Sequence, residues 1–492
     1  MTRTRLFAVL IPVLLVLVAG VVRFVDLGHP ERIIFDETYY VNDAREFLET
    51  GVEESFAVHP PVGKWLIAGG IAVFGDRPLG WRAAGAVAGT LVVLLTYLMA
   101  RRLVGWRGAA ALAGLLVAVD GLLFVQSRTS MLDAFLGLFV ALGAWLLLVD
   151  YDESRLAEER TVVTDGLPWR PHPFRLLAGL AFGLAIATKW SGLLALGGAG
   201  LLVIGWELAW RRRLTGRFRV ALGKLAGSVA LSLVLVPLGV YAVSYIPWLV
   251  NYATTTEGDD VCAEEGPCHV SIPGRLAGLA RYHVKVWNFH TDLEATHPYR
   301  APAWTWPIMQ RPVVYYWESC SAERAAGEAT TNDEGEAEEP EPCVVAQGNA
   351  GEIIALGNPA LWWGVLAALV PLGAGLAMRE NRAWFIFTFW AAQFVPWLAV
   401  QRASFFFYMV PAVPFMALAM AHGVTWLDEV VERRALRGGR EPRWRRVTPG
   451  ATAGAVVAVA ALALFLYFYP VLAGLEMDYD AVRQRWWLDT WI

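Results

Sequence analysis

The sequence predicts an all-α polytopic membrane protein. Of its 492 residues, 56% are hydrophobic and only 17% are charged, whereas globular proteins carry about 25% charged residues. Apolar runs of about 20 residues, the length that crosses a hydrocarbon core of about 30 Å, recur along the chain. A water-soluble fold of this length would have too few polar side chains to cover its surface.

Successive apolar runs predict about eleven membrane-spanning helices. They are residues 6–25, 83–100, 108–125, 131–149, 174–188, 191–210, 221–246, 359–377, 383–400, 403–424 and 449–470. Because Arg3 and Arg5 precede the first run, a cleavable signal peptide is an alternative there. The ten later runs and the lack of a clear small-residue cleavage site favour an uncleaved anchor.

The distribution of basic residues predicts the orientation of the chain. If the N-terminus is cytoplasmic, 24 of the 41 Lys and Arg residues fall in short cytoplasmic segments. Cytoplasmic loops carry such an excess, so the C-terminus is predicted outside. The basic runs at 211–213 and 433–446 are then lipid-headgroup anchors. A net charge of −4 argues against binding to nucleic acid.

Two outside segments are too long to be simple connectors and divide the chain into three parts. Residues 1–247 form an N-terminal membrane module with the external loop 26–82, residues 248–357 form a second external loop, and residues 358–492 form a C-terminal membrane module. Within the second loop, residues 272–289 have apolar side chains near helical spacing with basic residues between them. That pattern predicts a helix lying on the membrane surface.

All four cysteines lie in the second external loop, the more oxidising side of the predicted topology. Four cysteines permit three disulfide pairings. The pairing that is simplest locally joins Cys262 to Cys268 and Cys320 to Cys343. A zinc site is the alternative, although the spacings match no usual zinc finger. The acidic segment between Cys320 and Cys343 has no large apolar residue and is expected to be a solvated loop.

Asp36 and Glu37 form an acidic pair among apolar residues in the first external loop. Carboxylates in such surroundings are costly unless they are paired or used, because burial raises their pKa. The pair is therefore a candidate general base. The alternative is a helix N-cap, with Asp36 opening a helix and Glu37 interacting favourably with its dipole.

Positive charges collect on the same side of the membrane. Lys64 follows the rigid turn that begins at His59, and Arg128, Lys189 and Arg402 lie at outside ends of predicted spans. Snorkelling to lipid headgroups is one explanation for Arg128, Lys189 and Arg402, and the segment with Lys64 would by itself be only a turn. The other is convergence on a lipid-linked phosphate, whose charge must be stabilised as its bond breaks.

The second external loop also contains a stretch rich in aromatic residues and prolines. Rings with polar tips suit a groove for a sugar or a peptide, and its predicted lining is His59, His297, Tyr299, Trp304 and Trp306. His283, His290 and His297 are seven residues apart, which on one helix would place them on one face. A metal triad is thus an alternative, but Pro298 and the lack of further ligands disfavour it, and no metal is predicted.

A series of motifs resembles the protein O-mannosyltransferase family, in particular its actinobacterial branch. The motifs are FDE at 35–37, HPPVGK at 59–64, SRTSMLD at 127–133, TKWSG at 188–192, THPYRAPAWTWPIMQRP at 296–312, GNPALWW at 357–363 and FFFYMVPAVPF at 405–415. They cover nearly the whole chain in the family's order. Each motif is weak alone, but the set is specific.

The resemblance implies a GT-C glycosyltransferase fold in the cell membrane, with its active site at the external face. It also implies transfer of mannose from polyprenyl-phosphate mannose to Ser or Thr hydroxyls of secreted proteins near the Sec translocon. The lipid-linked sugar is a substrate, so no cofactor is expected. Eukaryotic members carry a β-trefoil MIR domain, for which residues 248–357 are too few.

The resemblance and the chemistry together assign roles to residues. Asp36 would accept the hydroxyl proton as general base, Glu37 would orient acceptor or donor, and the cations would stabilise the leaving phosphate, with inversion at the sugar C1. The first alternative is a GT-C enzyme that glycosylates a lipid or a cell-wall glycan. The second is a transporter, which the lack of internal repeats disfavours.

Overall fold

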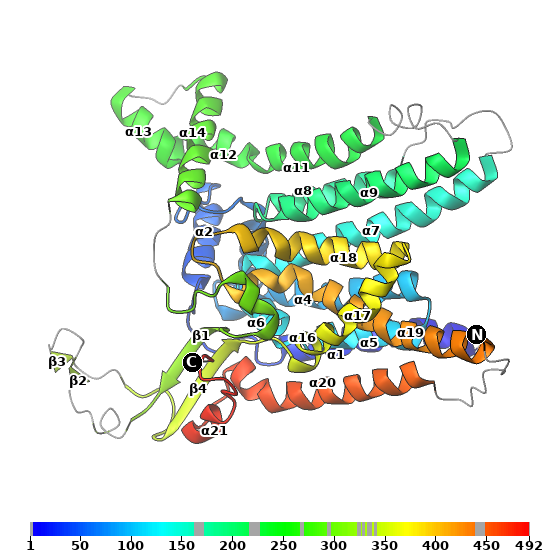
Figure 1. Cartoon of the computed structure of the whole chain (residues 1–492). Helices are drawn as coiled ribbons and strands as arrows, with labels where there is room; N and C mark the ends of the chain where they lie inside the picture. The colour runs from blue at the N-terminus through cyan, green and yellow to red at the C-terminus, as the bar shows by residue number, and fades with distance from the viewer. Residues whose placement is uncertain are drawn as a thin grey trace.

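Two long loops and the ends of the helices form a cap at one end of a helical bundle in the computed structural model (Figure 1). The structure describes residues 3–161, 172–215, 227–265, 270–292, 297–321, 326, 330–331, 337–338, 342–437 and 448–491. We call the end that carries α2 (Glu37–Thr50), α14 (Ile272–Thr291) and the C-terminus the cap end, and the opposite end, which carries the N-terminus, the N-terminal end.

Eight helices among the described residues are long and apolar enough to cross a membrane. They lie in α1 (Arg3–Phe24), α4 (Pro78–Val104), α7 (Leu132–Thr161), α9 (Gly192–Thr215), η1 (Leu231–Leu235) with α11 (Val236–Ser244), α16 (Pro359–Trp362) with α17 (Gly364–Ala377), η5 (Phe406–Ala412) with α19 (Val413–Arg437), and α20 (Pro449–Ala473). The pair α5 (Arg107–Ala118) and α6 (Gly121–Arg128) bends by 53° and would make a ninth. The prediction of a helical multi-span membrane protein is therefore confirmed.

The predicted number of about eleven spans is too high by this measure. The segments 174–188 and 383–400 do contain helices, but the α-helices there, α8 (Pro173–Ile186) and α18 (Asn381–Phe394), have only 14 residues each, and α18 continues as a 3-10 helix to Ala399. At 1.5 Å per residue such a helix is about 21 Å long, which is short of the hydrocarbon core. Hydropathy detects the apolar composition of a segment but not the residue at which its helix ends.

The cap is built from short elements. Its helices are α2, α3 (Val62–Phe74), α12 (Ile246–Val250), η2 (Tyr252–Thr254), α13 (Thr256–Glu265), α14, η3 (Ala303–Ile308) and α21 (Tyr479–Arg483). Its strands are β1 (Val313–Ser319), β4 (Asn349–Ala355) and β5 (Met477–Asp478), with a separate pair β2 (Thr330–Thr331) and β3 (Ala337–Glu338). The short helix η4 (Val395–Ala399) follows α18. The antiparallel strands β1, β4 and β5 form one sheet with β4 in the middle.

The predicted surface helix is α14, which lies across the direction of the spanning helices (Figure 1). Its N-cap is Ser271, whose side chain accepts a hydrogen bond from the backbone N–H of Gly274. Tyr282 and Val286 are buried, whereas Ile272 and Trp287 are 73% and 60% exposed. An exposed apolar face on a helix beside a bundle of spans fits contact with a membrane surface.

The disulfide prediction is confirmed where the structure describes it. Cys320 and Cys343 are bonded, with their Cα atoms 5.5 Å apart. Cys262 is also in a disulfide, while Cys268, its predicted partner, lies outside the described residues. The bond joins the end of β1 to the segment that leads into β4, so it closes the acidic loop at the edge of the cap.

The C-terminal residues belong to the cap rather than to the third membrane module. The short strand β5 pairs with β4, and the buried Trp491 donates from its indole Nε1 to the carbonyl of Met309 at 2.7 Å. Trp486 donates to the Glu352 carboxylate at 3.1 Å. The segment after α20 therefore folds together with the second loop, through strand pairing and indole contacts. The predicted boundary at 358 separates these two parts of the cap.

A buried polar junction joins the N- and C-terminal parts at the bend between α5 and α6. Asp120 caps α6 by accepting from the N–H of Leu123 at 2.9 Å, and it also accepts from the N–H of Asn358 and the indole of Trp362 at 3.1 and 2.8 Å. The Asn358 amide donates to the Val119 carbonyl that the bend leaves free. These bonds fix the direction of α6, which leads to the candidate site.

Candidate active site

The backbone at Phe35 separates the two carboxylates of the acidic pair. Phe35 has φ +47°, in the left-handed region that non-glycine residues rarely occupy. Its ring stacks on Tyr315 of β1 with the centroids 4.3 Å apart, which holds this conformation. The helix α2 then begins at Glu37, so Asp36 and Glu37 leave the turn in different surroundings.

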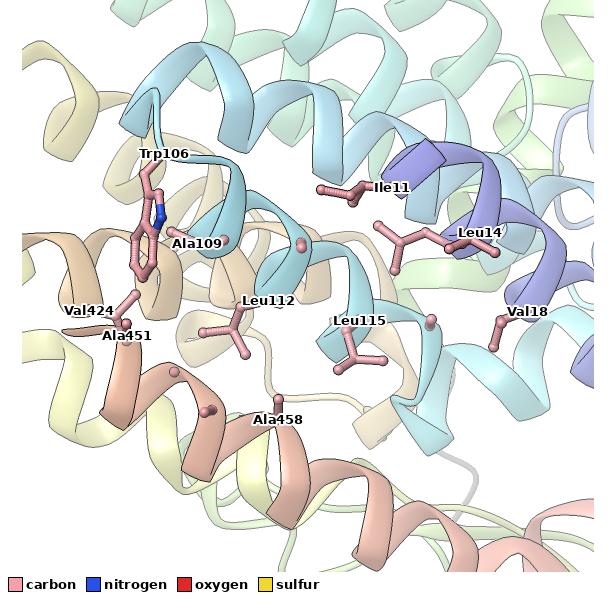
Figure 2. Close-up of a pocket in the computed structure, with 16 residues that line it drawn as sticks. Ile11, Leu14, Val18, Trp106, Ala109, Leu112, Leu115, Val424, Ala451 and Ala458 are labelled. Carbon is pink, nitrogen blue, oxygen red and sulfur yellow. The ribbon is translucent and has the colours of Figure 1, made fainter. Parts of the chain in front are cut away.

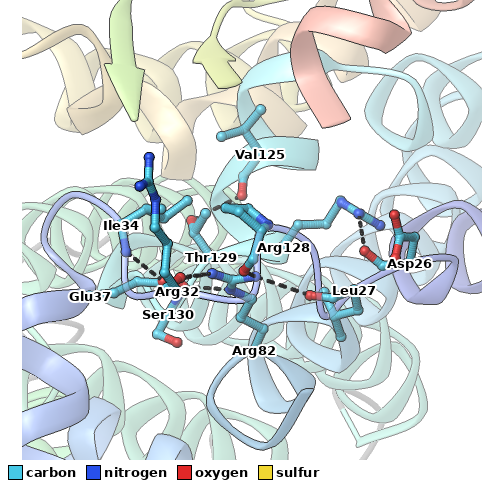
Figure 3. A network of polar contacts seen from close by, with 11 residues as sticks. Asp26, Leu27, Arg32, Ile34, Glu37, Arg82, Val125, Arg128, Thr129 and Ser130 are labelled. Carbon is cyan, nitrogen blue, oxygen red and sulfur yellow. Dashed lines mark hydrogen bonds and ion pairs between the residues drawn. The ribbon is translucent and has the colours of Figure 1, made fainter. Parts of the chain in front are cut away.

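Glu37 is buried in an ion pair with Arg82 of α4. The Arg82 Nε and Nη2 donate to the two carboxylate oxygens at 2.8 and 2.9 Å, and both side chains are fully buried. The same carboxylate accepts from the backbone N–H groups of Ile34 and Ser130 at 3.1 and 3.0 Å (Figure 3). A carboxylate with four donors has little capacity left for a substrate.

Arg82 also holds the loop before the acidic pair. Its guanidinium donates to the carbonyls of Leu27, Pro30 and Arg32 at 3.3, 3.0 and 3.0 Å (Figure 3). Together with Glu37, it ties the loop 26–36 to α4 and to the turn between α6 and α7. Glu37, predicted to orient donor or acceptor, is thus bonded within the protein on both carboxylate oxygens.

Asp36 differs from Glu37 in its hydrogen bonding. It occupies the N-cap position of α2, but its side chain makes no capping hydrogen bond, and the carboxylate has no hydrogen bond or ion pair with any described residue. Burial raises its pKa to about 6, with Lys189 lowering the pKa and Asp133 raising it. The N-cap alternative therefore does not account for Asp36, and a carboxylate with this pKa is suited to accept a proton near neutral pH.

Lys189 lies beside Asp36 in the turn between α8 and α9. Its ammonium is 2.9 Å from a carboxylate oxygen of Asp133, in the first turn of α7, and lies 4.7 Å from the ring centroid of Tyr408. The Lys189 and Asp133 charges both act on Asp36. The structure thus brings Asp36 and Lys189 together, as predicted, but Lys189 already shares its charge with Asp133.

Arg402 is the cation near the site that has no protein partner among the described residues. It is half-buried before η5, and it acts electrostatically on Tyr408, His59 and His290. These groups are also the ones on which Lys189 acts. Arg402 and Lys189 therefore face one region, next to Asp36.

Two histidines lie against this region with their rings stacked 5.5 Å apart. Burial, with the nearby cations, lowers the pKa of His59 well below its usual value and lowers that of His290 to about 4, so both are neutral at pH 7. The His290 Nε2 bonds to the Val58 carbonyl at 3.1 Å and must therefore donate. Its buried Nδ1 has no partner among the described residues and is left as an acceptor.

Arg128 lies near the site, but its guanidinium is bonded to the backbone through both Nη1 and Nη2. Its guanidinium donates to the carbonyls of Val22, Arg23, Val25 and Asp26 at 3.3, 3.0, 2.6 and 2.9 Å. Figure 3 shows the side chain pointing toward Asp26, away from Glu37. Arg128 thus satisfies the free carbonyls at the end of α1, and we do not retain it as a phosphate ligand.

Lys64 is also paired within the protein. Its ammonium is 2.9 Å from the Asp43 carboxylate, with both side chains fully buried, and it donates to the Phe56 carbonyl at 3.1 Å. The preceding turn packs closely, since a Cβ at Gly63 would lie 2.7 Å from Leu132. Lys64 therefore fixes α2 against α3 and does not reach a phosphate.

The predicted groove residues divide into two groups. His297 and Tyr299 are half-buried, and the His297 ring contacts Phe405 edge-on at 5.0 Å, three residues from Arg402. Trp306, in contrast, is 1% exposed and bonded to the Ala301 carbonyl, and Trp304 is 67% exposed. Trp306 is a core residue and does not line a groove, whereas Trp304, at the surface, stays a candidate together with His59, His297 and Tyr299.

Several residues of the site were not selected from the sequence. Arg82 and Tyr408 carry no local signal, because an arginine at a span end and a tyrosine in an aromatic run are common. Asp133 is the last residue of the SRTSMLD motif at 127–133, so that motif could have indicated it. His290 entered only as part of a metal triad, and no cluster of three metal-ligating side chains occurs in the described part of the chain.

Comparison with known proteins shows the family of the chain. A family model described as dolichyl-phosphate-mannose-protein mannosyltransferase matches residues 77–250. A model of the C-terminal four-span region of protein O-mannosyltransferases matches residues 276–382 and 376–491. A polyprenol-phosphate-mannose–protein mannosyltransferase of Mycobacterium tuberculosis is 32% identical over 97% of this chain and 91% of that protein. The chain belongs to the protein O-mannosyltransferase family.

Further relatives extend the comparison across the family. The corresponding protein of Mycolicibacterium smegmatis is 31% identical over 96% of this chain and 91% of that protein. The structure is similar to the Saccharomyces cerevisiae protein O-mannosyltransferase Pmt1-Pmt2 complex, with a TM-score of 0.75 over 98% of this chain and 92% of that chain, at 14% identity. It also resembles ArnT of Cupriavidus metallidurans, with a TM-score of 0.50 at 18% identity. The GT-C fold predicted for this protein O-mannosyltransferase is confirmed.

Substitutions of the two adjacent carboxylates are expected to change the stability of the protein in opposite ways. Glu37→Gln leaves the buried Arg82 charge unpaired and is expected to destabilise the protein by about 3–5 kcal/mol. Asp36→Asn removes a buried carboxylate without a partner, so the melting temperature should stay equal or rise. Thermal denaturation of both variants in detergent at pH 7 measures this difference. A loss of stability in Asp36→Asn equal to that in Glu37→Gln would contradict the separate roles.

Proposed function

We propose that the region around Asp36 catalyses transfer of mannose from polyprenyl-phosphate mannose to a hydroxyl of a protein, the reaction of the family to which the chain belongs. We assign the reaction to this site because the Asp36 carboxylate has no partner among the described residues and has a pKa of about 6. It lies in the cap with neutral histidines and with Arg402, for which the described part of the chain offers no partner. A base, a cation and polar groups for hydroxyls are what the reaction requires.

Asp36 acts as the general base in this proposal. The hydroxyl of Ser or Thr is a weak nucleophile at neutral pH, so its proton must leave as the oxygen attacks the sugar C1. The bond from C1 to the phosphate oxygen breaks at the same time, and polyprenyl phosphate departs with the electron pair. The proton passes to Asp36. Attack opposite the leaving group inverts the anomeric centre.

Arg402 and Lys189 stabilise the leaving phosphate. Arg402 provides a guanidinium without a protein partner among the described residues, and Lys189 shares its charge with Asp133. Charge-assisted hydrogen bonds of this kind are about twice as strong as neutral ones, and they matter most where charge develops in the transition state. Glu37 and Arg82 contribute by fixing the turn that carries Asp36.

Neutral histidines provide contacts to hydroxyl groups. The free Nδ1 of His290 accepts a hydrogen bond from a sugar or acceptor hydroxyl without adding charge next to Asp36. His59, stacked against it, has a polar edge for the same purpose. We place the acceptor peptide beside His297 and Tyr299, whose rings are half-buried near Phe405.

The site faces the outside of the cell in this proposal. The chain is a multi-pass membrane protein, and its termini lie at opposite ends of the bundle (Figure 1). With the Lys and Arg excess cytoplasmic, the N-terminal end is cytoplasmic and the cap end external. Secreted proteins then reach Asp36 as they leave the Sec translocon.

A transfer assay tests the reaction and the base together. Purified protein in detergent receives polyprenyl-phosphate mannose and a Ser/Thr-rich peptide, and mannose on the peptide is measured. Asp36→Asn is expected to lower the rate by about 10²–10⁴-fold, the usual contribution of a general base. Full activity in this variant would contradict the assignment. Mannose on lipid or glycan instead of peptide would favour the lipid-directed alternative.

The pH dependence of the reaction tests the surroundings of Asp36. The base must be unprotonated, so kcat/KM should be constant at high pH and fall on the acid side with an apparent pKa of about 6. Lys189→Met removes a positive charge that lowers this pKa, and should move the acid limb to higher pH. Asp133→Asn removes a negative charge that raises it, and should move the limb to lower pH. An unchanged midpoint in both variants would identify another group as the base.

Arg402 is expected to act mainly on the donor. Arg402→Gln should raise the KM for polyprenyl-phosphate mannose by about 10–100-fold, since a hydrogen bond to a charged group contributes about 1.5–3 kcal/mol, and Arg402→Lys should restore part of the affinity. Arg379→Gln is the matched control, because Arg379 is an exposed arginine between α17 and α18 without a described partner. Equal donor KM values for Arg402→Gln and this control would rule out the phosphate contact.

A further inference from the structure

A chain of hydrogen bonds joins the surface helix α14 to the turn that carries Lys189. The helix α11 runs beside α8, and α14 crosses at the cap end of α11 (Figure 1). The Trp190 indole Nε1 donates to the Tyr241 hydroxyl of α11 at 2.9 Å, and this hydroxyl lies 2.9 Å from Nε2 of His283 on α14. The other ring nitrogen of His283, Nδ1, is 2.8 Å from the Leu279 carbonyl. We call this series of bonds the Trp190–His283 chain.

The donors and acceptors of the Trp190–His283 chain follow from its two ends. A carbonyl only accepts, so His283 Nδ1 carries a hydrogen and donates it to Leu279. In a neutral imidazole Nε2 is then the acceptor, and it takes the hydrogen of the Tyr241 hydroxyl. An indole only donates, so the Tyr241 oxygen accepts from Trp190. The Tyr241 hydroxyl is therefore the link that both ends of the chain require.

The turn between α8 and α9 is tight, so Trp190 and Lys189 cannot move separately. The Lys189 N–H donates to the Ala185 carbonyl at 3.0 Å, and the Lys189 carbonyl accepts from the Gly192 N–H at 2.9 Å. A Cβ at Gly192 would lie 2.7 Å from the backbone of Ala185, so only glycine lets α9 begin this close to α8. Holding the Trp190 indole therefore also holds the backbone from which the Lys189 side chain extends.

The Trp190 ring also contacts two histidines of α14. Its centroid lies 6.3 Å from that of His283, with the ring planes 18° apart, and 5.8 Å from that of His290. These histidines are seven residues apart and share one face of the helix. One face of α14 thus holds both the Trp190–His283 chain and His290, which belongs to the proposed site.

The attachment of α14 to the cap does not depend on the Trp190–His283 chain. Arg275, in its first turn, donates to the Leu249 carbonyl of α12 at 2.8 Å. Further along, Arg281 pairs with Glu257 of α13 at 2.8 Å. Because these contacts join α14 to α12 and α13, loss of the chain should leave the helix in place. The chain is then best explained by what it does at its other end, the turn with Lys189.

We propose that α14 positions Lys189 for the donor phosphate, with Tyr241 and His283 as positioning residues that act through Trp190. The inference rests on the proposed function, in which Lys189 stabilises the leaving phosphate. The Asp133 carboxylate, 2.9 Å from the ammonium, orients the tip of the lysine side chain. The Trp190–His283 chain fixes its base. Both are needed, because a displacement of about 1 Å can lower a rate about 10²-fold.

Separate KM values for the donor and the peptide test the proposal. Tyr241→Phe removes the hydroxyl but keeps the ring, and it should raise the KM for polyprenyl-phosphate mannose about 5–50-fold while the peptide KM stays unchanged. Tyr245→Phe is the matched control. Tyr245 is buried four residues further along, and its hydroxyl lies 3.4 Å from that of Tyr241 without linking Trp190 to His283. Its donor KM should equal that of the wild type.

Substitutions of His283 separate positioning from a loss of structure. His283→Gln places an amide oxygen near the position of Nε2 and should keep most of the donor affinity, whereas His283→Leu should behave as Tyr241→Phe. Equal donor KM values for Tyr241→Phe and Tyr245→Phe would overturn the proposal. An equal rise in the donor and peptide KM values would also overturn it, because that pattern indicates loosening of the whole cap.

Binding of polyprenyl phosphate measures the same contact without turnover. Tyr241→Phe and His283→Leu should lower the affinity for this probe severalfold, and Tyr245→Phe and His283→Gln should keep it. If the wild type moves no mannose to peptide, the proposed function fails, but this pattern of affinities would still support the positioning of Lys189. If the wild type transfers mannose and the four variants bind polyprenyl phosphate equally, the positioning inference alone fails.

Discussion

The buried ion pair between Glu37 and Arg82 determines where the other groups of the site lie. It joins the segment between α1 and α2 to α4, and through the N–H of Ser130 it also joins the turn between α6 and α7. Removing two charges from water is costly, and the cost is offset here by four donors on the carboxylate and three carbonyls on the guanidinium. With so many bonds, the turn at Phe35 has one arrangement. The ion pair thereby sets the positions of Asp36, Asp133 and Lys189 relative to one another.

The acidic pair illustrates how environment assigns roles to identical chemistry. Glu37 has a full set of donors and serves as a structural anchor, while one residue earlier Asp36 has none among the described residues and a raised pKa. A pair of carboxylates whose surroundings drive their pKa values apart is a recurrent arrangement in enzymes. The strained backbone at Phe35, held by the stacked Tyr315 ring, is what separates the two side chains.

The two ends of the bundle differ in the chemistry that they offer. The cap end gathers neutral histidines, a carboxylate and cations around a polar region, which suits a reaction at a sugar phosphate. The half of the bundle toward the N-terminal end has an apolar cavity lined by residues of α1, α5 and α20 (Figure 2). A membrane enzyme that acts on a lipid-linked substrate must keep its polar site away from the hydrocarbon and still hold its spans together. In the described residues the polar site lies at the cap end, and apolar packing dominates toward the N-terminal end.

The sequence alone determined the properties that depend on local composition and on motif order. Apolar runs located the helices, the ordered motifs indicated the family, and the spacing of Cys320 and Cys343 suggested their bond. It also selected Asp36, Lys189 and Arg402, since charges in apolar surroundings are visible without a structure. The tertiary structure alone decided which charges are free. Arg128 and Lys64 resemble Arg402 in the sequence, but the first is occupied by carbonyls of α1 and the second by Asp43. A backbone carbonyl has no sequence signature, so the partner of a cation emerges only when distant segments are packed together.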